Sequence, residues 1–381
     1  MAYKRVTMQD IADACGLSRN TVSKIFNDRG AVPEATRALV FRKAQELGYL
    51  QAAGAALVHA AAPVPPDVPL PQGILNPPGG PASSNAPTPP DAAGKSIALL
   101  ACHLPTEYHF CTVFVPAFAE RLSAMGYTLM VYKITPEELK QRVLPGAMSP
   151  EQTAGILAIE LFDREYMDMV CSLGIPTIFV DAYAGAWGAL LKCDFLSMEN
   201  IAATMTITDH VIAEGAKRLG FMGDITHCNS FLERWVGFNI AASRAGLEVD
   251  KGLCILDEDI QPYTDADWVY SRLKRLPALP DAFICGNDLL AIRLMTALKR
   301  MGISIPEDVM VAGFDGQPQA AVVEPALTTA YIPSAEIGRC AAELIYRRIE
   351  DGKRPFRRVY VNTVPIFRAS TDRTGIKREA D

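Results

Sequence analysis

Residues 6–49 constrain the fold of this chain most strongly, because their pattern predicts a set of three short helices. Thr7 and Asp10 have the spacing of a capping box, so a first helix should begin near Met8. Its apolar face recurs at helical spacing, at Met8, Ile11, Ala12 and Cys15. Gly16 follows at the point where the end of a helix needs a positive φ. The segment therefore predicts a helix over about residues 8–15.

A second and a third helix should follow after short turns. Ser18 is a suitable N-cap for the second, and Pro33 suits the first turn of the third. The buried positions are expected at Val22, Ile25 and Phe26 in the second helix, and at Leu39, Val40, Ala44 and Leu47 in the third. The short gap at Gly16 is typical of a helix-turn-helix.

The second helix leaves polar side chains on its outer side, at Arg19, Asn20, Ser23, Lys24 and Asn27. In a helix-turn-helix, the start of the second helix enters the major groove of DNA. Arginine suits guanine and asparagine suits adenine, each contributing about 1–3 kcal/mol of discrimination. Ser18 and Thr21 suit phosphate contacts that read no sequence. The alternative interpretation is a small helical bundle with a solvated polar face.

The charge distribution favours DNA binding confined to this head. Residues 1–50 contain eight Lys and Arg against five Asp and Glu, a net charge of +3. The whole chain has a net charge of −6, which leaves −9 for the remainder. A basic head on an acidic body fits a nucleic-acid-binding segment joined to a different kind of domain.

The amino-acid sequence of this segment closely resembles that of the DNA-binding head in the lac repressor/galactose repressor family. The matching motifs are V-T-M-Q-D-I-A, G-L-S-R-N-T-V-S-K, V-P-E-A-T-R and L-G-Y, within residues 6–50. The resemblance implies base contacts from Arg19 and Asn20. It also implies backbone or groove contacts from Thr7, Met8, Ser18, Thr21, Ser23, Lys24 and Asn27. Lys24 stands where this family more often has arginine, which favours a point-charge contact over a bidentate one.

Length and composition indicate a cytoplasmic protein of two or three domains. The 381 residues exceed one head domain, and no apolar run is long enough to cross a membrane. The N-terminus lacks an apolar signal segment. Nine scattered cysteines without a C-x-x-C motif suggest reduced core residues. The five histidines have no metal-binding spacing, so we expect no metal and no cofactor.

Residues 51–95 predict a flexible linker. Alanine dominates residues 52–62, and eleven prolines fall between Pro63 and Pro90. Relatives usually have a short hinge helix here, which inserts a leucine wedge into the minor groove. QAAGAALVHAAA occupies that position, with Leu57 and Val58 as candidate wedges. The linker is either a low-complexity insertion or a tether that lets the heads span variable half-site spacings.

From Ser96 onward, predicted strands alternate with predicted helices. The expected strands are SIALLAC, YTLMVY, GILAIEL, PTIFVDA, LGFMG, CILDED, AFICG and VMVAGFD, and the expected helices include 164–173, 199–214, 231–245, 265–275 and 288–301. This alternation predicts an α/β body with parallel sheets covered by helices. Ligands bind at the carboxyl ends of strands in such folds.

The loops after these strands resemble the effector domain of the same family, which is related to periplasmic sugar-binding proteins. The motifs R-x-x-G-F, N-D-x-x-A, V-x-G-F-D and P-A-L-T-T occur in order within residues 96–371. The resemblance implies two lobes, one of about 96–196 and 328–352 and the other of about 197–327 and 353–371, before a tail at 372–381. It implies an effector held by Arg234, Asn287 and Asp315 between aromatic walls at Phe110 and Tyr263. Glu199-Asn200 replaces the usual Asp-Asn, which leaves sugars, nucleobases and phosphosugars open as effectors.

The predicted fold is therefore an all-α helix-turn-helix head with an α/β two-lobed periplasmic-binding-protein-like effector domain. The resemblance implies a transcriptional regulator, most often a repressor in this family, that binds a palindromic double-stranded DNA operator as a homodimer. A small-molecule effector, sugar-like in most relatives, would control operator binding. The competing classes are an enzyme and a pure solute-binding protein. We find no nucleophile–base pair and no phosphate-binding loop, and therefore expect no catalytic residues.

Overall fold

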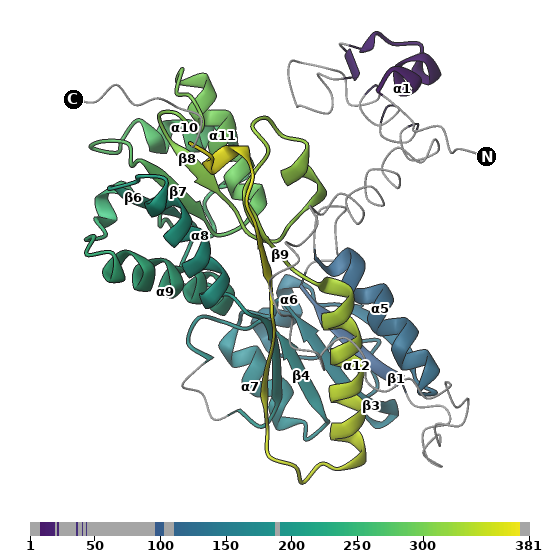
Figure 1. The fold of residues 1–381 in the computed structure, drawn as a ribbon. Helices are drawn as coiled ribbons and strands as arrows, with labels where there is room; N and C mark the ends of the chain where they lie inside the picture. The colour runs from purple at the N-terminus through teal and green to yellow at the C-terminus, as the bar shows by residue number, and fades with distance from the viewer. Residues whose placement is uncertain are drawn as a thin grey trace, which may run out of the picture. The chain divides into compact units, whose positions relative to one another are not determined.

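The chain forms two compact units, Met1–Asn85 and Ala86–Asp381. The computed structural model describes residues 8–19, 21–22, 36, 40, 43, 96–102, 110–186 and 191–373. Figure 1 traces the chain and labels its elements. Among the helices within these ranges, none combines the length and the apolar character that crossing a bilayer requires.

In the first unit, α1 spans Met8–Cys15, as the sequence predicts. It ends at Gly16, whose φ of 65° confirms the left-handed conformation expected there. Ile11 and Ala12 on α1 are fully buried in a small core. Val22 and Val40 complete that core, so the three predicted helical segments of the head contribute side chains to one cluster.

The first lobe of the second unit is built on a six-stranded parallel sheet, in the order β10-β5-β4-β3-β1-β2. The four central strands are almost continuously buried because helices cover both faces of the sheet. The outermost strands, β2 and β10, are partly exposed. The strands are β1 (Ser96–Ala101), β2 (Thr128–Lys133), β3 (Thr153–Ile159), β4 (Thr177–Val180), β5 (Asp194–Met198) and β10 (Arg358–Val361).

The described residues of this lobe form the helices α5 (Cys111–Ala124), α6 (Pro136–Gln141), α7 (Arg164–Ser172) and α12 (Ser334–Glu350). α5 and α12 pack against each other. A glycine is required at their contact, because a Cβ on Gly338 would lie 2.5 Å from the carbonyl oxygen of Phe114. α6 begins with a capping box between Thr135 and Glu138. Short 3₁₀ turns complete the unit at Pro150–Gln152, Lys251–Leu253, Pro318–Ala321 and Ala369–Thr371.

The second lobe contains a three-stranded parallel sheet in the order β6-β7-β8. Its strands are β6 (Leu219–Met222), β7 (Ala282–Cys285) and β8 (Met310–Ala312), and every residue in them is buried. The helices are α8 (Ile201–Ala213), α9 (Asn229–Arg244), α10 (Ala266–Leu273) and α11 (Asp288–Arg300). α8 packs on α9, and α10 packs on α11.

Two strands carry the chain between the lobes, β9 (Thr329–Tyr331) and β11 (Val364–Ile366), and they pair in antiparallel fashion. The predicted lobe boundary at residue 353 is wrong, because β10 pairs with β5 in the sheet of the first lobe. The cause is a buried ion pair that anchors this segment. Asp194 on β5 accepts hydrogen bonds from the Arg348 guanidinium and from the backbone N–H of Arg357.

The predicted alternation of strands and helices is confirmed in the second unit, with one exception. CILDED does not form a strand, and Ile255 makes only an isolated parallel bridge to Met222. The chain turns away after this bridge because the Asp224 carboxylate accepts a hydrogen bond from the backbone N–H of Asp259. No prediction was made from the sequence for β5, β10, α6, α12 and the two crossover strands.

Candidate functional site

The start of the second helix of the head has the cap that the sequence predicts. The hydroxyl of Ser18 accepts a hydrogen bond from the backbone N–H of Thr21 at 3.0 Å. The two side-chain hydroxyls lie 2.8 Å apart. Ser18 and Arg19 are both exposed, as a DNA-contacting edge requires.

Several predicted head residues cannot be placed. Thr7, Asn20, Ser23, Lys24, Asn27, Leu57 and Val58 lie outside the described residues, and only the backbone of Met8 is described. Their roles stay predictions.

In the second unit, acidic residues with left-handed backbones stand at or shortly after the carboxyl ends of strands. Glu160 follows β3 with φ 50°, and Asp181 follows β4 with φ 61°. Asp315 lies in the loop after β8 with φ 114°. Non-glycine residues seldom adopt this conformation, and such positions cluster at functional sites. Asp315, which the sequence singled out, and Asp181 are therefore unusual in their backbone as well as in their chemistry.

Arg234 is the central cation of this region. It lies on α9, is only 3 % exposed, and its Nη1 is 3.6 Å from Asp315 Oδ1. Its Nε donates to Asn200 Oδ1 at 2.9 Å, and its Nη1 also donates to the carbonyl oxygen of Gly286. The guanidinium carbon lies 3.7 Å from the centroid of the Phe314 ring, a close cation–π contact. The structure thus brings together Arg234 and Asp315, as predicted, and adds Asn200.

Asp181 connects the two lobes. Its Oδ2 accepts a hydrogen bond from the Ser230 hydroxyl at 2.6 Å, and its Oδ1 accepts from the backbone N–H groups of Ala182 and Ser230. Burial raises the pKa of the Asp181 carboxyl to about 6, although the Ser230 and Ala182 hydrogen bonds and the charge of Arg234 oppose that rise. The Asp181 carboxyl should therefore take up a proton on mild acidification, near pH 6.

Asp288 is fully buried beside Asp315 and ties three segments together. It accepts hydrogen bonds from the Thr329 hydroxyl on β9 at 2.6 Å and from the backbone N–H of Gln317 at 2.8 Å. Burial raises the pKa of its carboxyl well above the usual range, and the nearby Asp315 raises it further. These bonds give Asp288 a structural position at the crossover. Among the described residues, no three potential ligands cluster as a metal ion would need.

Three other predicted effector residues have local partners in the structure. Asn287 caps α11, because its side chain accepts a hydrogen bond from the backbone N–H of Leu290 at 2.9 Å. Phe110 is half-buried at the start of α5 and meets Phe114 edge-on, with 6.0 Å between ring centroids. Tyr263 is 4 % exposed in the core of the second lobe, and its hydroxyl donates to the carbonyl oxygen of Asp257 at 2.6 Å.

A buried polar network around Glu233 was not predicted. Glu233 is 1 % exposed and accepts hydrogen bonds from Asn229 Nδ2, from Asn200 Nδ2 and from the Tyr360 hydroxyl. Tyr360 lies on β10 in the first lobe, so this network also spans the two lobes. Glu233 lies beside Arg234 in the segment S-F-L-E-R at the start of α9, and this position could have drawn attention to it. No local sequence motif marks Tyr360.

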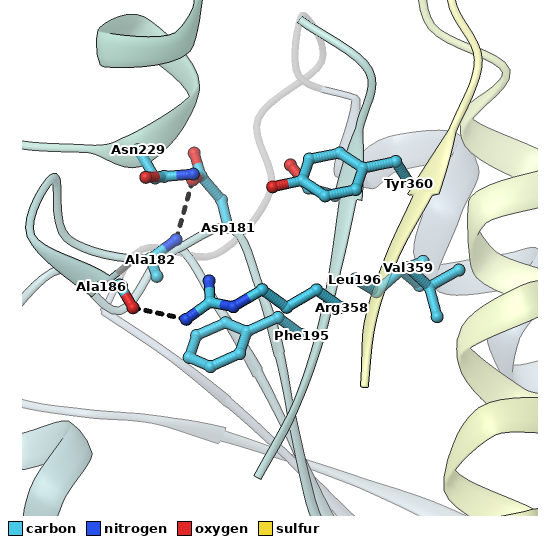
Figure 2. A pocket seen from close by; sticks show the side chains of 10 residues that line it. Asp181, Ala182, Ala186, Phe195, Leu196, Asn229, Arg358, Val359 and Tyr360 are labelled. Atoms are coloured by element: carbon cyan, nitrogen blue, oxygen red, sulfur yellow. Dashed lines mark hydrogen bonds between the residues drawn. The ribbon is translucent and has the colours of Figure 1, made fainter. Parts of the chain in front are cut away.

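A small cavity opens beside these residues (Figure 2), with a volume of about 10 Å³. Asp181 and Asn229 line it together with Arg358 and Tyr360 from β10. The Arg358 guanidinium donates to the carbonyl oxygen of Ala186 and stacks over Phe195 at 4.4 Å. The cavity thus lies where β4, α9 and β10 meet.

Comparison with known proteins relates both units to one group of regulators. Residues 7–51 match the family described as bacterial regulatory proteins, lacI family, and residues 208–371 match the periplasmic binding protein-like domain. The HTH-type transcriptional repressor PurR of Photobacterium profundum is 25 % identical over 370 residues, covering 96 % of this chain and 98 % of that protein. The PurR repressor of Haemophilus influenzae is 23 % identical with the same coverage.

Solved structures share the fold. The transcriptional regulator CelR in complex with cellobiose superposes with a TM-score of 0.65 at 22 % identity, covering 96 % of this chain and all of the other. The lac repressor dimer bound to operator and the anti-inducer ONPF gives a TM-score of 0.58 at 17 % identity, covering 97 % and 99 %. With the helix-turn-helix head and the two-lobed body described above, the chain combines a lacI-family DNA-binding head with a periplasmic-binding-protein-like body and is a DNA-binding transcriptional regulator.

Proposed function

We propose that this regulator is a cytoplasmic repressor that binds a palindromic operator as a homodimer and releases or retains it according to a small molecule bound between its lobes. One observation carries the proposal: the buried Arg234 lies 3.6 Å from Asp315, beside strand ends that hold Asp181 in a left-handed conformation. An ion pair buried at the junction of two lobes can be rearranged by a ligand. Differential binding of that ligand to two lobe arrangements then changes DNA affinity, typically by about 1–3 kcal/mol.

The proposed effector contacts are Arg234, Asp315 and the Asn287 amide group. Phe110 is half-buried and is retained as an aromatic wall. Tyr263 supports the second lobe from within, because its hydroxyl is already bonded to the carbonyl oxygen of Asp257. One solved relative is a complex with cellobiose, and hydroxyl-rich ligands suit an arginine that faces a carboxylate.

The proposed DNA contacts begin at Ser18, Arg19 and Thr21 and continue through Asn20, Ser23, Lys24 and Asn27, with Thr7 and Met8 beside the backbone. Leu57 or Val58 would serve as the minor-groove wedge. One head reads only a half-site, so a palindrome requires two copies. Exposed apolar side chains on α5 and on the edge strand β2 support a dimer contact through the body, namely Val113, Met130 and Val131.

The test is operator binding by the full-length protein with and without candidate effectors. In fluorescence anisotropy with a selected operator, the logarithm of the binding constant should fall linearly with the logarithm of the salt concentration, because phosphate contacts release counterions. Binding of one compound should shift the operator affinity of the wild type. In the Arg234→Met variant, that shift should disappear. A shift of equal size in the variant would remove Arg234 from the effector response.

A further inference from the structure

Two cysteines that the proposed function does not use lie at one edge of the six-stranded sheet. Cys171 is in the last turn of α7, and the chain enters β4 at Thr177 after a short connection. Cys193 directly precedes Asp194, the first residue of β5, which pairs with Ile178 on β4. Neighbouring parallel strands begin at the same edge of a sheet, so both cysteines lie where β4 and β5 begin.

The side chains of these two cysteines are in contact. Cys193 is only 2 % exposed in the core of the first lobe, and Cys171 packs against the same hydrophobic cluster. The Cys193 thiol donates a hydrogen bond to the Cys171 sulfur. All nine cysteines of the chain are thiols in the structure. Sulfurs that already contact each other can approach the disulfide bond length of about 2.05 Å by rotation of their side chains, without unfolding.

The two thiols differ in a way that suits an ordered reaction with an oxidant. Cys171 is half-buried, and the hydrogen bond from Cys193 lowers its pKa, although burial and the Asp168 carboxylate oppose this effect. The same hydrogen bond, together with burial, raises the pKa of Cys193. By contrast, burial raises the pKa of Cys340, which is also half-buried. The more accessible member of the pair therefore has the greater thiolate character, and the thiolate is the form that attacks an oxidant.

We propose that Cys171 and Cys193 form a modification site, at which a hydroperoxide converts the two thiols to a disulfide between α7 and the residue before β5. The Cys171 sulfur first attacks one peroxide oxygen and becomes a sulfenic acid. The O–O bond breaks, and the other oxygen takes the Cys171 proton and leaves as water or an alcohol. The Cys193 sulfur then attacks the Cys171 sulfur, and the sulfenic hydroxyl leaves as water with the Cys193 proton. The two thiols together lose two electrons, and the peroxide gains them.

The disulfide joins two segments that the native fold already holds together. The loop that it closes contains the whole of β4, and Cys193 adjoins Asp194, the buried partner of Arg348. A cross-link stabilises a protein mainly by restricting its unfolded chain, so oxidation should raise the Tm by several degrees. A thiol reductant should restore both thiols and return the Tm to its original value.

The first experiment oxidises the folded, full-length protein with hydrogen peroxide, alkylates the remaining thiols, and analyses an unreduced tryptic digest by mass spectrometry. Trypsin cleaves after Lys192, so Cys171 and Cys193 fall in separate peptides, 165–192 and 193–217, each with one cysteine. The expected product is a linked pair of these peptides, which dithiothreitol separates. Alkylation of both cysteines after peroxide treatment, linkage of either to another cysteine, or a sulfinic acid at Cys171 without linkage would overturn the proposal.

Three variants assign the chemistry to the pair. Cys171→Ser should abolish both the linked peptides and the rise in Tm, whereas Cys340→Ser, the control at another half-buried cysteine of the same lobe, should retain both. In Cys193→Ser, the Cys171 sulfenic acid has no second thiol, so dimedone should label Cys171 more than in the wild type. A Tm rise that persists in Cys171→Ser, or equal dimedone labelling in Cys193→Ser and the wild type, would contradict the proposal. These measurements need neither operator nor effector, so their outcome is independent of the proposed function.

Discussion

The Asp181 carboxylate accepts a 2.6 Å hydrogen bond from the Ser230 hydroxyl, and this contact joins the end of β4 to the first turn of α9. The two residues belong to different lobes. Any ligand that separates or tightens the lobes must act on this bond. Burial raises the pKa of the Asp181 carboxyl to about 6, so the protonation of this contact should change between pH 5 and pH 7.5.

The stability contribution of Asp181 should decrease as pH rises. A pKa of about 6 in the folded state, against 3.8 for an ordinary aspartate, means that folding favours the protonated form. This contribution is complete below pH 3.8 and is lost as pH rises through 6, on the order of 3 kcal/mol in total. Calorimetry should therefore show that the Tm at pH 5 minus the Tm at pH 7.5 is smaller in Asp181→Asn than in the wild type.

Asp281 offers a control of opposite sign. Hydrogen bonds from the backbone N–H groups of Arg218 and Lys217 lower the pKa of its carboxyl and outweigh its partial burial. Its contribution is present above the unfolded pKa and is lost in acid, so Asp281→Asn should reduce stability at pH 7.5 more than at pH 4. An unchanged pH profile in Asp181→Asn would show that Asp181 does not titrate near pH 6.

The buried pair of Asp194 and Arg348 should be the most sensitive ion pair of the first lobe. Both side chains are nearly inaccessible, and the guanidinium donates two hydrogen bonds of 2.8 and 2.9 Å to the carboxylate. Arg348→Met would leave a buried carboxylate without its cation, and should lower the free energy of unfolding by about 3–5 kcal/mol. Chemical denaturation at pH 7.5 measures this.

The exposed pair of Arg339 and Glu336 on the same helix is the matched comparison. Its side chains are about half exposed, so Arg339→Met should change stability by about 0–1 kcal/mol. Similar losses in the two variants would contradict the assignment of Asp194 and Arg348 as the anchor of β10.

The features of this structure that could be predicted from sequence are those that depend on residues close to one another in the chain. The cap at Ser18, the positive φ at Gly16 and the strands that lead to Asp181 and Asp315 follow from neighbouring residues, and local patterns predicted them. Asp194 and Tyr360 act through partners more than a hundred residues away. No periodicity marks such contacts, and for the same reason the pairing of β10 with the first sheet was missed.

The roles of aromatic residues were least accessible from sequence. The aromatic ring of Tyr263 suits stacking on a ligand. In the structure, however, its hydroxyl donates to the carbonyl oxygen of Asp257, and its ring packs on Trp268 with 4.9 Å between centroids. A buried tyrosine needs such a partner. Only the three-dimensional position of Asp257 decides between a wall of a cleft and a member of the core.

Gly237 should tolerate no side chain. A Cβ at this position would lie 2.4 Å from the backbone carbonyl oxygen of Ile201, where α9 crosses α8. Gly237→Ala should force the helices apart and lower Tm by several degrees, as overpacking typically costs about 1–3 kcal/mol. Gly146→Ala is the control, because its Cβ would meet nothing within 4 Å. Equal Tm values for the two variants would contradict the close packing of α8 and α9.

Arg19 should determine one base of each half-site. It is exposed at the start of the second helix, where Ser18 caps the turn. Arg19→Ala should relax the preference at one position, with a loss of about 1–3 kcal/mol for the preferred base. Operator variants with every base at each position measure this by anisotropy. A uniform loss across all bases would limit Arg19 to a phosphate contact.

The central claim is that this chain reads a two-fold operator under the control of its second unit. Selection of bound sequences from random duplex DNA with the full-length protein tests it most directly, repeated with a compound that shifts the Tm. We predict a palindromic site with one fixed half-site spacing, and a change in its enrichment when the compound is present. Enrichment of no sequence in either condition would contradict the account.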